Sequence, residues 1–173
     1  MVDESWKAEF DAYIRAITPN PHDPTYSVLK AHLKFEERLR AHLDQVLAYP
    51  KALEGARLSF AQLLAFARAC SHEPDDWCWV AVSKLNKLRN TLAHETGGGD
   101  LRAKIDDYVR FVVRSTGEDL PEADTPAEEV RSASQGDRLK LFSGLDMVTG
   151  GLYSYFGVML SARERRATIQ SSP

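Results

Sequence analysis

Apolar residues recur at the spacing of an α-helix in every strongly patterned segment of this chain, and this feature most constrains the fold. The clearest case is the long segment from Thr25 to Leu47, whose apolar face comprises Val28, Leu29, Leu33, Phe35, Leu39, Leu43, Val46 and Leu47. No segment alternates apolar and polar residues in the manner of a half-buried strand, and no hairpin turn signal is present. The pattern therefore predicts an all-α protein.

The helical segments predict an up-and-down bundle of about five or six helices with a long second helix and a long C-terminal helix. The expected helices cover residues 3–17, 25–47, 58–69, 75–94, 101–115 and 139–166. Asp75 or Asp76 is expected to cap the fourth helix and Asp100 the fifth, after the glycines at 97–99 end the fourth. Two adjacent glycines, Gly150 and Gly151, predict a bend or weak point in the last helix.

One stretch, residues 117–136, differs in composition from the rest of the chain. It is acidic, contains prolines and has almost no large apolar residues, which predicts a solvated flexible linker. The expected organisation is a helical bundle at 1–116, the acidic flexible linker at 117–136, and a C-terminal helix at 137–173. That last helix is expected to pack on the bundle or on a dimer partner.

Overall composition narrows the classes of function. The net charge of −3 gives no general sign of a nucleic-acid or membrane partner, although a local basic patch remains open. The N-terminus, MVDESWKAEF, lacks the apolar core of a signal peptide, and no apolar run approaches the ~20 residues of a membrane span. A cytoplasmic protein with two reduced thiols, Cys70 and Cys78, is therefore expected. No metal-ligand cluster is recognisable, so neither a metal nor a cofactor is predicted.

Polar residues interrupt the apolar face of the second helix. His32 and Glu36 fall near its middle and Arg40 at its edge, at the i, i+4, i+8 spacing that stacks side chains along one side of a helix. Buried polar groups need partners because desolvation is costly. The three residues either pair for purely structural reasons or line a polar pocket and hold a catalytic group in place. The other histidines, His22, His42 and His72, are expected to face solvent.

The fourth helix carries a second group of polar residues near its end. Its apolar face is Trp77, Cys78, Ala81, Leu85, Leu88 and Leu92. Arg89 lies at the edge of this face and is expected to point toward Glu36. Asn90 and His94 lie well round from it, on the side that also holds Trp79, Ser83 and Asn86, and are expected to point outward. In the last helical turn, the negative end of the helix favours a protonated His94.

These residues resemble the signature of the HEPN superfamily, in which an arginine and a polar residue precede a histidine by a few positions. Here Arg89, Asn90 and His94 match it within KLNKLRNTLAHE. Together with ERLRAHL (37–43) and LSFAQLLAFARA (58–69), the stretch is similar to the branch that includes mannitol-operon-repressor-like proteins. The resemblance covers about residues 25–115.

The resemblance implies a metal-independent endoribonuclease or RNA-associated protein, as in toxin or defence systems. Two domains would pair as a homodimer so that Arg89 and His94 of both copies form one composite site, with Asn90 orienting the histidine or binding phosphate. Glu36 would fix Arg89, with His32 and Arg40 as supporting residues. Lys84 and Lys87 offer a modest basic surface for nucleic acid.

The implied partners are a second copy of the chain, RNA, and a cognate antitoxin or regulatory protein. Because the superfamily also holds inactive members, the alternative is a non-catalytic helical regulator or protein-interaction module of the mannitol-repressor-like type.

Overall fold

The computed structural model describes residues 24–94, 99–116 and 135–161, with side chains for residues 24–93, 101–116 and 144–161. All regular secondary structure in these ranges is helical, which confirms the predicted all-α class. The elements are α2 (Pro24–Val46), the 3₁₀ helix η1 (Pro50–Leu53), α3 (Phe60–Ala69), α4 (Cys78–His94), α5 (Gly99–Thr116) and α7 (Gln135–Leu160). The helix expected at residues 3–17 and the tail from residue 162 lie outside the described residues.

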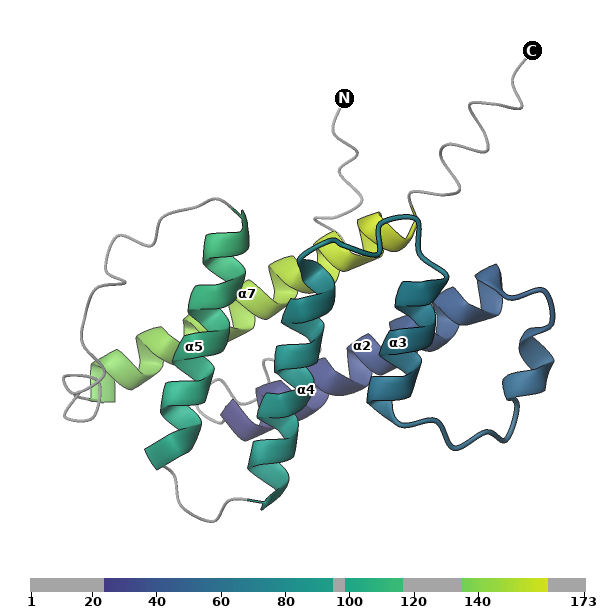
Figure 1. The fold of residues 1–173 in the computed structure, drawn as a ribbon. Helices are drawn as coiled ribbons and strands as arrows, with labels where there is room; N and C mark the ends of the chain where they lie inside the picture. Colours follow the sequence, from purple (N-terminus) through teal and green to yellow (C-terminus); the bar gives the residue numbers. More distant parts are fainter. Residues whose placement is uncertain (1–23, 95–98, 117–134, 162–173) are drawn as a thin grey trace.

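The helices form two layers (Figure 1). In one layer α3, α4 and α5 lie side by side and alternate in direction, as an up-and-down bundle requires. In the other layer α2 and α7 lie next to each other and run in the same direction, crossing the first layer. As a result, α4 contacts α2, α3, α5 and α7.

The core centres on three aromatic rings contributed by three different helices. Phe35 of α2, Trp79 of α4 and Phe156 of α7 are each at most 2% exposed. The Phe156 ring centroid lies 5.1 Å from that of Trp79 and 5.7 Å from that of Phe35. Edge-to-face and tilted geometries of this kind are favourable for aromatic pairs. This cluster fixes α7 to both α2 and α4.

Two further contacts attach α7 to the same helices. The Arg38 guanidinium stacks 3.8 Å from the centroid of the Tyr153 ring, and its Nη1 donates to the Tyr153 carbonyl at 2.8 Å. Tyr155 stacks on Trp77, and its hydroxyl donates to Asp76 Oδ2 at 2.6 Å. Burial, together with the Asp76 carboxylate, raises the pKa of Tyr155 to about 12. The expected C-terminal helix therefore packs on its own chain.

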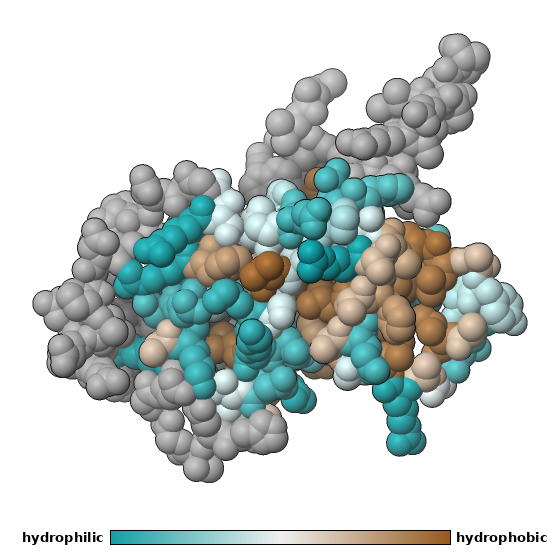
Figure 2. Space-filling model, in the orientation of Figure 1, coloured by the Kyte–Doolittle hydropathy of each residue, from teal (hydrophilic) through white to brown (hydrophobic). Residues whose placement is uncertain are grey.

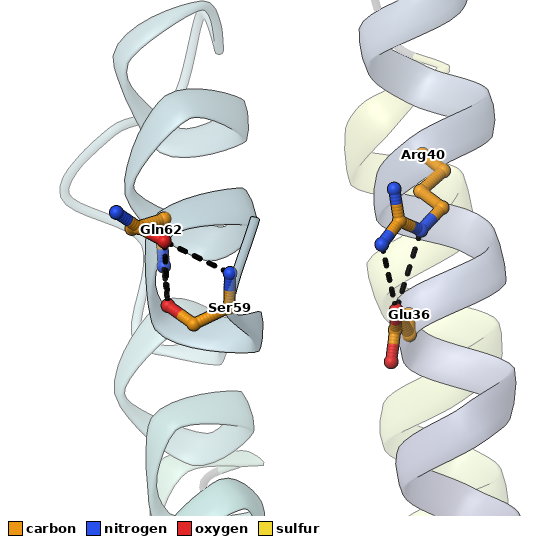
Figure 3. A network of polar contacts seen from close by, with 4 residues as sticks. All are labelled: Glu36, Arg40, Ser59 and Gln62. Atoms are coloured by element: carbon orange, nitrogen blue, oxygen red, sulfur yellow. Dashed lines mark hydrogen bonds and ion pairs between the residues drawn. The ribbon is translucent and has the colours of Figure 1, made fainter. Parts of the chain in front are cut away.

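Local sequence signals explain where α3 and α4 begin. The Ser59 hydroxyl accepts the Gln62 N–H, while the Gln62 side chain accepts the Ser59 N–H, which makes a complete capping box at α3 (Figure 3). At the start of α4, Asp76 Oδ1 accepts the Cys78 N–H at 2.8 Å. Asp76 thus has the capping role predicted for it.

Other helix boundaries differ from the prediction. α5 begins at Gly99, so Asp100 lies inside its first turn and not before it. An acidic residue in that turn still complements the positive helix end, so the same composition serves a helix that starts two residues earlier. α4 ends at His94 as predicted, but it begins at Cys78 and not at residue 75. α7 begins at Gln135, inside the expected linker, and continues as one helix past Gly150 and Gly151.

The buried side of α2 also differs from the predicted apolar face. Leu29 and Leu33 are 40% and 52% exposed, whereas His42, expected to face solvent, is buried. The reason is that α3, α4 and α7 contact α2 from different directions, so its buried surface is wider than one stripe and is centred away from Leu29 and Leu33. His72 is exposed as expected, and His22 lies outside the described residues.

A buried carboxyl lies on the inner face of α7. Asp146 is 8% exposed and forms a hydrogen bond with Ser27 of α2. Burial raises the pKa of Asp146 above its usual value of 3.8, and the Ser27 contact offsets only part of this effect. Folding therefore favours the protonated acid, so the free energy of unfolding falls as pH rises from about 4 through the folded-state pKa of Asp146.

Replacing Asp146 with asparagine is expected to remove this loss of stability, because the amide carries no charge at any of these pH values. The Asp146→Asn variant should gain stability relative to wild type as the pH is raised from 4 to 7. Urea unfolding of both proteins at pH 4, 5.5 and 7 measures the difference. A difference that stays constant across the three pH values would contradict the assignment of a buried, titrating carboxyl.

Candidate functional site

Two of the predicted site helices, α2 and α4, are joined by a hydrogen bond from the buried His32. Its Nε2 lies 3.1 Å from Asn86 Oδ1, and its ring lies 4.1 Å from the Phe60 ring at the start of α3. The His32 side chain is 8% exposed, as its predicted position within the α2 interface requires. Its partner, Asn86, was not among the predicted site residues, although its i, i+4 relation to Asn90 along α4 was a usable signal.

Arg89 and Asn90 contact each other near the end of α4. Arg89 Nη1 donates to Asn90 Oδ1 at 3.2 Å, with Arg89 half-buried and Asn90 exposed. Within the described part of the chain, no carboxylate forms an ion pair with Arg89. The guanidinium is thus positioned by an amide, and no carboxylate of the described residues compensates its charge.

The predicted pairing of Glu36 with Arg89 is replaced by a pairing within α2. Glu36 Oε1 accepts bonds from Arg40 Nη2 at 2.9 Å and from Arg40 Nε at 3.3 Å (Figure 3). The i, i+4 spacing along one helix brings these side chains together without any contribution from α4. Helix phase alone indicated the direction in which Glu36 points. It did not indicate that Arg40, on the same helix, is its partner.

The electrostatics of this region disfavour a second proton on His32. Burial of the ring lowers the pKa of His32, and the nearby Arg89 charge lowers it further. The Asn86 hydrogen bond and the Glu36 charge act in the opposite direction without reversing the net effect. Arg89 is therefore close enough to His32 to influence its protonation.

The two predicted nucleic-acid lysines face different surroundings. Lys84 Nζ forms an ion pair with Asp107 of α5 at 2.7 Å and lies 5.0 Å from the centroid of the Phe111 ring. Lys87 is exposed. The positive charge of Lys84 is thus partly compensated by Asp107 on the neighbouring helix.

His94 is the last residue of α4, and its side chain lies outside the described set. Its backbone position, one helical turn beyond Asn90, follows the spacing read from the sequence. The structure therefore joins His32 with Asn86 across the α2–α4 crossing, Arg89 with Asn90 on α4, and Glu36 with Arg40 on α2. We call this set of six residues the α2–α4 seam.

The side of α4 predicted to point outward is partly buried. Trp79 is 2% exposed, and its Nε1 donates to the Glu73 carbonyl at 2.8 Å. Because α4 occupies the middle of its layer, it is covered on two sides, and a single apolar direction on a helical wheel does not describe it. The expectation that Asn86 and Trp79 share an open face with Asn90 is wrong for those two residues.

An apolar groove runs between α3 and α4. It has a volume of about 510 Å³, and its lining residues are Ala61, Leu64, Ala65, Arg68, Ala69, Pro74, Trp79, Val80, Ser83 and Asn86. Figure 2 shows apolar residues gathered on this side of the molecule, over α3 and beside α4. Val80 in this lining is 46% exposed. The groove could not be predicted from the sequence pattern because its walls come from two helices.

The described residues include no group of three or more His, Cys, Asp or Glu side chains placed to bind a metal ion. None of the helices in the described ranges has the length and apolar character needed to cross a bilayer. Cys70 and Cys78 are free thiols, and burial raises the pKa of the Cys78 thiol.

Comparison with protein-family models, with curated proteins and with solved structures finds no match to this chain.

Proposed function

We propose that the protein is a metal-independent endoribonuclease of the HEPN type, acting in a toxin or defence setting. In this proposal, Arg89, Asn90 and His94 of two copies form one site across a homodimer. The observation that carries it is the Arg89–Asn90 pair: a half-buried guanidinium positioned by an amide, uncompensated by any described carboxylate, one turn before a histidine. A cation in such surroundings favours binding of an oxyanion.

The residue types match the chemistry of RNA cleavage by its own ribose. The 2′-hydroxyl attacks the adjacent phosphate, forming a new P–O bond while the bond to the 5′-oxygen breaks. His94 takes the proton from the 2′-hydroxyl or returns one to the leaving oxygen. Arg89 holds the phosphate and stabilises the negative charge that builds on it, and Asn90 keeps the guanidinium in place. DNA lacks the attacking hydroxyl and is not expected to be cleaved.

A homodimer supplies what one copy lacks. Cleavage needs one group to remove a proton and another to donate one, and each chain offers a single histidine at the end of α4. A two-fold interface at this end of the bundle would place both copies of His94 on one substrate. Asp107, by its ion pair with Lys84, leaves Lys87 and Arg89 as the cations of α4 available to a phosphate backbone.

The direct test is incubation of the purified protein with single-stranded RNA in the presence of a chelator. Wild type is expected to cleave the RNA and leave DNA of the same sequence intact, while His94→Ala leaves both intact. Equal cleavage by wild type and His94→Ala would indicate a contaminating nuclease and contradict the proposal. The oligomeric state of both proteins, measured by light scattering, controls for loss of the dimer.

A second candidate function is supported by the α3–α4 groove. Its walls are mostly apolar, with Arg68 as the one charged residue in its lining. A groove of this kind favours an apolar segment of a partner over a phosphate backbone. This candidate is a non-catalytic helical regulator or interaction module of the mannitol-repressor-like type. RNA that stays intact with correctly folded, dimeric wild type would favour it over the ribonuclease.

A further inference from the structure

The crossing of α2 and α4 brings two pairs of residues together on successive helical turns. On α2, His32 and Glu36 are four residues apart, and on α4, Asn86 and Arg89 are three apart, so each pair shares one side of its helix. The His32–Asn86 hydrogen bond fixes the crossing point at 3.1 Å. Arg89 and Glu36 therefore lie one turn away from the buried imidazole, on different helices.

The hydrogen bond also determines where the imidazole holds its proton. Asn86 Oδ1 is an acceptor only, so His32 Nε2 must donate to it. The neutral ring accordingly carries its proton on Nε2 and leaves Nδ1 free to take a second one. The second proton makes the ring a cation without breaking the bond to Asn86.

Three elements surround this ring. α3 presents the uncharged Phe60 ring, α4 presents Arg89, and α2 itself presents Glu36. Burial and the Arg89 charge lower the pKa of His32, and Glu36 raises it. Figure 3 shows Glu36 directed to Arg40, so its negative charge is shared with a second cation. The charge that opposes His32 protonation across the crossing is thus that of Arg89.

We propose that the α2–α4 crossing is a proton-linked oxyanion site, in which a phosphate group bound to Arg89 draws one proton onto His32. The ligand class is a phosphate oxyanion, either free or within an RNA backbone; the inference rests on the proposed function only for the second source. An anion at Arg89 cancels the positive charge opposing the second proton and adds a negative charge beside the ring. The effect is reciprocal, so protonation of His32 tightens anion binding.

The coupling has a measurable upper limit. When one proton is taken up with the anion, the affinity rises by at most about tenfold for each unit by which the pH falls. The affinity depends on pH in this way only between two pH values: the titration midpoint of His32 in the free protein and its midpoint in the bound protein. His32 is therefore a positioning residue that tunes Arg89, and the site binds phosphate more tightly in mildly acidic conditions.

The test follows the imidazole resonances of the full chain by NMR across pH. The His32→Gln variant assigns the His32 signal among the five histidines. Two probes are compared with sodium chloride at matched ionic strength: sodium sulfate, and a single-stranded oligoribonucleotide with 2′-O-methyl sugars, which has no attacking hydroxyl. In wild type, the titration midpoint of His32 is expected to rise with the bound probe. Response to both probes indicates a general oxyanion site, and response to the oligonucleotide alone indicates a phosphodiester site.

Two variants that each replace an arginine with glutamine provide the matched comparison. Arg89→Gln is expected to raise the His32 midpoint of the free protein and to abolish its response to either probe. Arg114→Gln removes the same charge from an exposed position in the last turn of α5, and should titrate like wild type. If Arg89→Gln does not fold, as judged by circular dichroism, the shift of the His32 midpoint in wild type on probe binding still tests the proposal.

Probe binding with an unchanged His32 midpoint in wild type would overturn the inference, as would the absence of any probe binding. The result is separate from the ribonuclease test, because neither probe is cleaved. A protein that leaves RNA intact but shows the midpoint shift refutes the ribonuclease proposal and supports the proton-linked site. A protein that cleaves RNA with an unresponsive His32 refutes the proton-linked site alone.

Discussion

Replacing Arg89 with glutamine is expected to lower the rate of RNA cleavage by about 10²- to 10³-fold, the usual cost of removing one group that stabilises transition-state charge. Glutamine is polar but uncharged and lacks the planar fork of the guanidinium. Arg89→Lys should fall between wild type and Arg89→Gln, since it keeps the charge but not the two-point geometry. Single-turnover rates on a defined single-stranded RNA measure the effect directly.

The control for this experiment is Lys87→Gln on the same helix. It lowers the general attraction for RNA without touching the Arg89–Asn90 pair, so it should mainly weaken binding. An Arg89→Gln variant that only raises KM, with kcat unchanged, would show that Arg89 binds ground-state phosphate and does not stabilise the transition state. That outcome would contradict the role assigned to it.

Replacing Phe156 with alanine is expected to cost about 3–5 kcal/mol of unfolding free energy, because it leaves a cavity where three helices meet. The lost ring contacts Phe35 and Trp79 and is completely buried. A domain of this size has about 5–15 kcal/mol of stability in total, so the variant should be close to its unfolding limit. Urea unfolding followed by circular dichroism measures the shift in midpoint.

Val158→Ala is the matched control for that measurement. Val158 lies two residues further along α7 and is 40% exposed, so its truncation should change stability by no more than about 0.5 kcal/mol. Similar losses in the two variants would mean that α7 does not pack on the bundle through Phe156. The slope of each transition must also be compared, because a changed slope indicates a changed unfolded state.

The helical class and the positions of α2 to α5 were predictable because apolar spacing records the helical period directly. What the period does not record is how many neighbours a helix has. Leu33 and His42 were assigned to the wrong environments because α2 is covered by several helices, so its buried surface does not follow one stripe. Trp79 was misplaced for the same reason on α4.

The positions of the site residues could be predicted from the sequence, but the pairing of their side chains could not. Arg89 and Asn90 are sequence neighbours near a helix end, and the structure joins their side chains. Glu36 pairs with Arg40 instead of Arg89, because a local i, i+4 partner competes with a distant one. Asn86 was missed as the partner of His32 because local spacing relates Asn86 to Asn90 but does not indicate a contact spanning 54 positions in the chain.

α4 contributes residues both to the core and to the α2–α4 seam, and this affects which substitutions the protein can accept. Between Leu85 and Asn90, core positions alternate with seam positions: Leu85 and Leu88 are buried, while Asn86, Arg89 and Asn90 are held in polar contacts. A rotation of the helix that relieved a poorly packed leucine would also displace the guanidinium. Selection for folding and selection at the seam therefore act on one short stretch of α4, from Leu85 to Asn90.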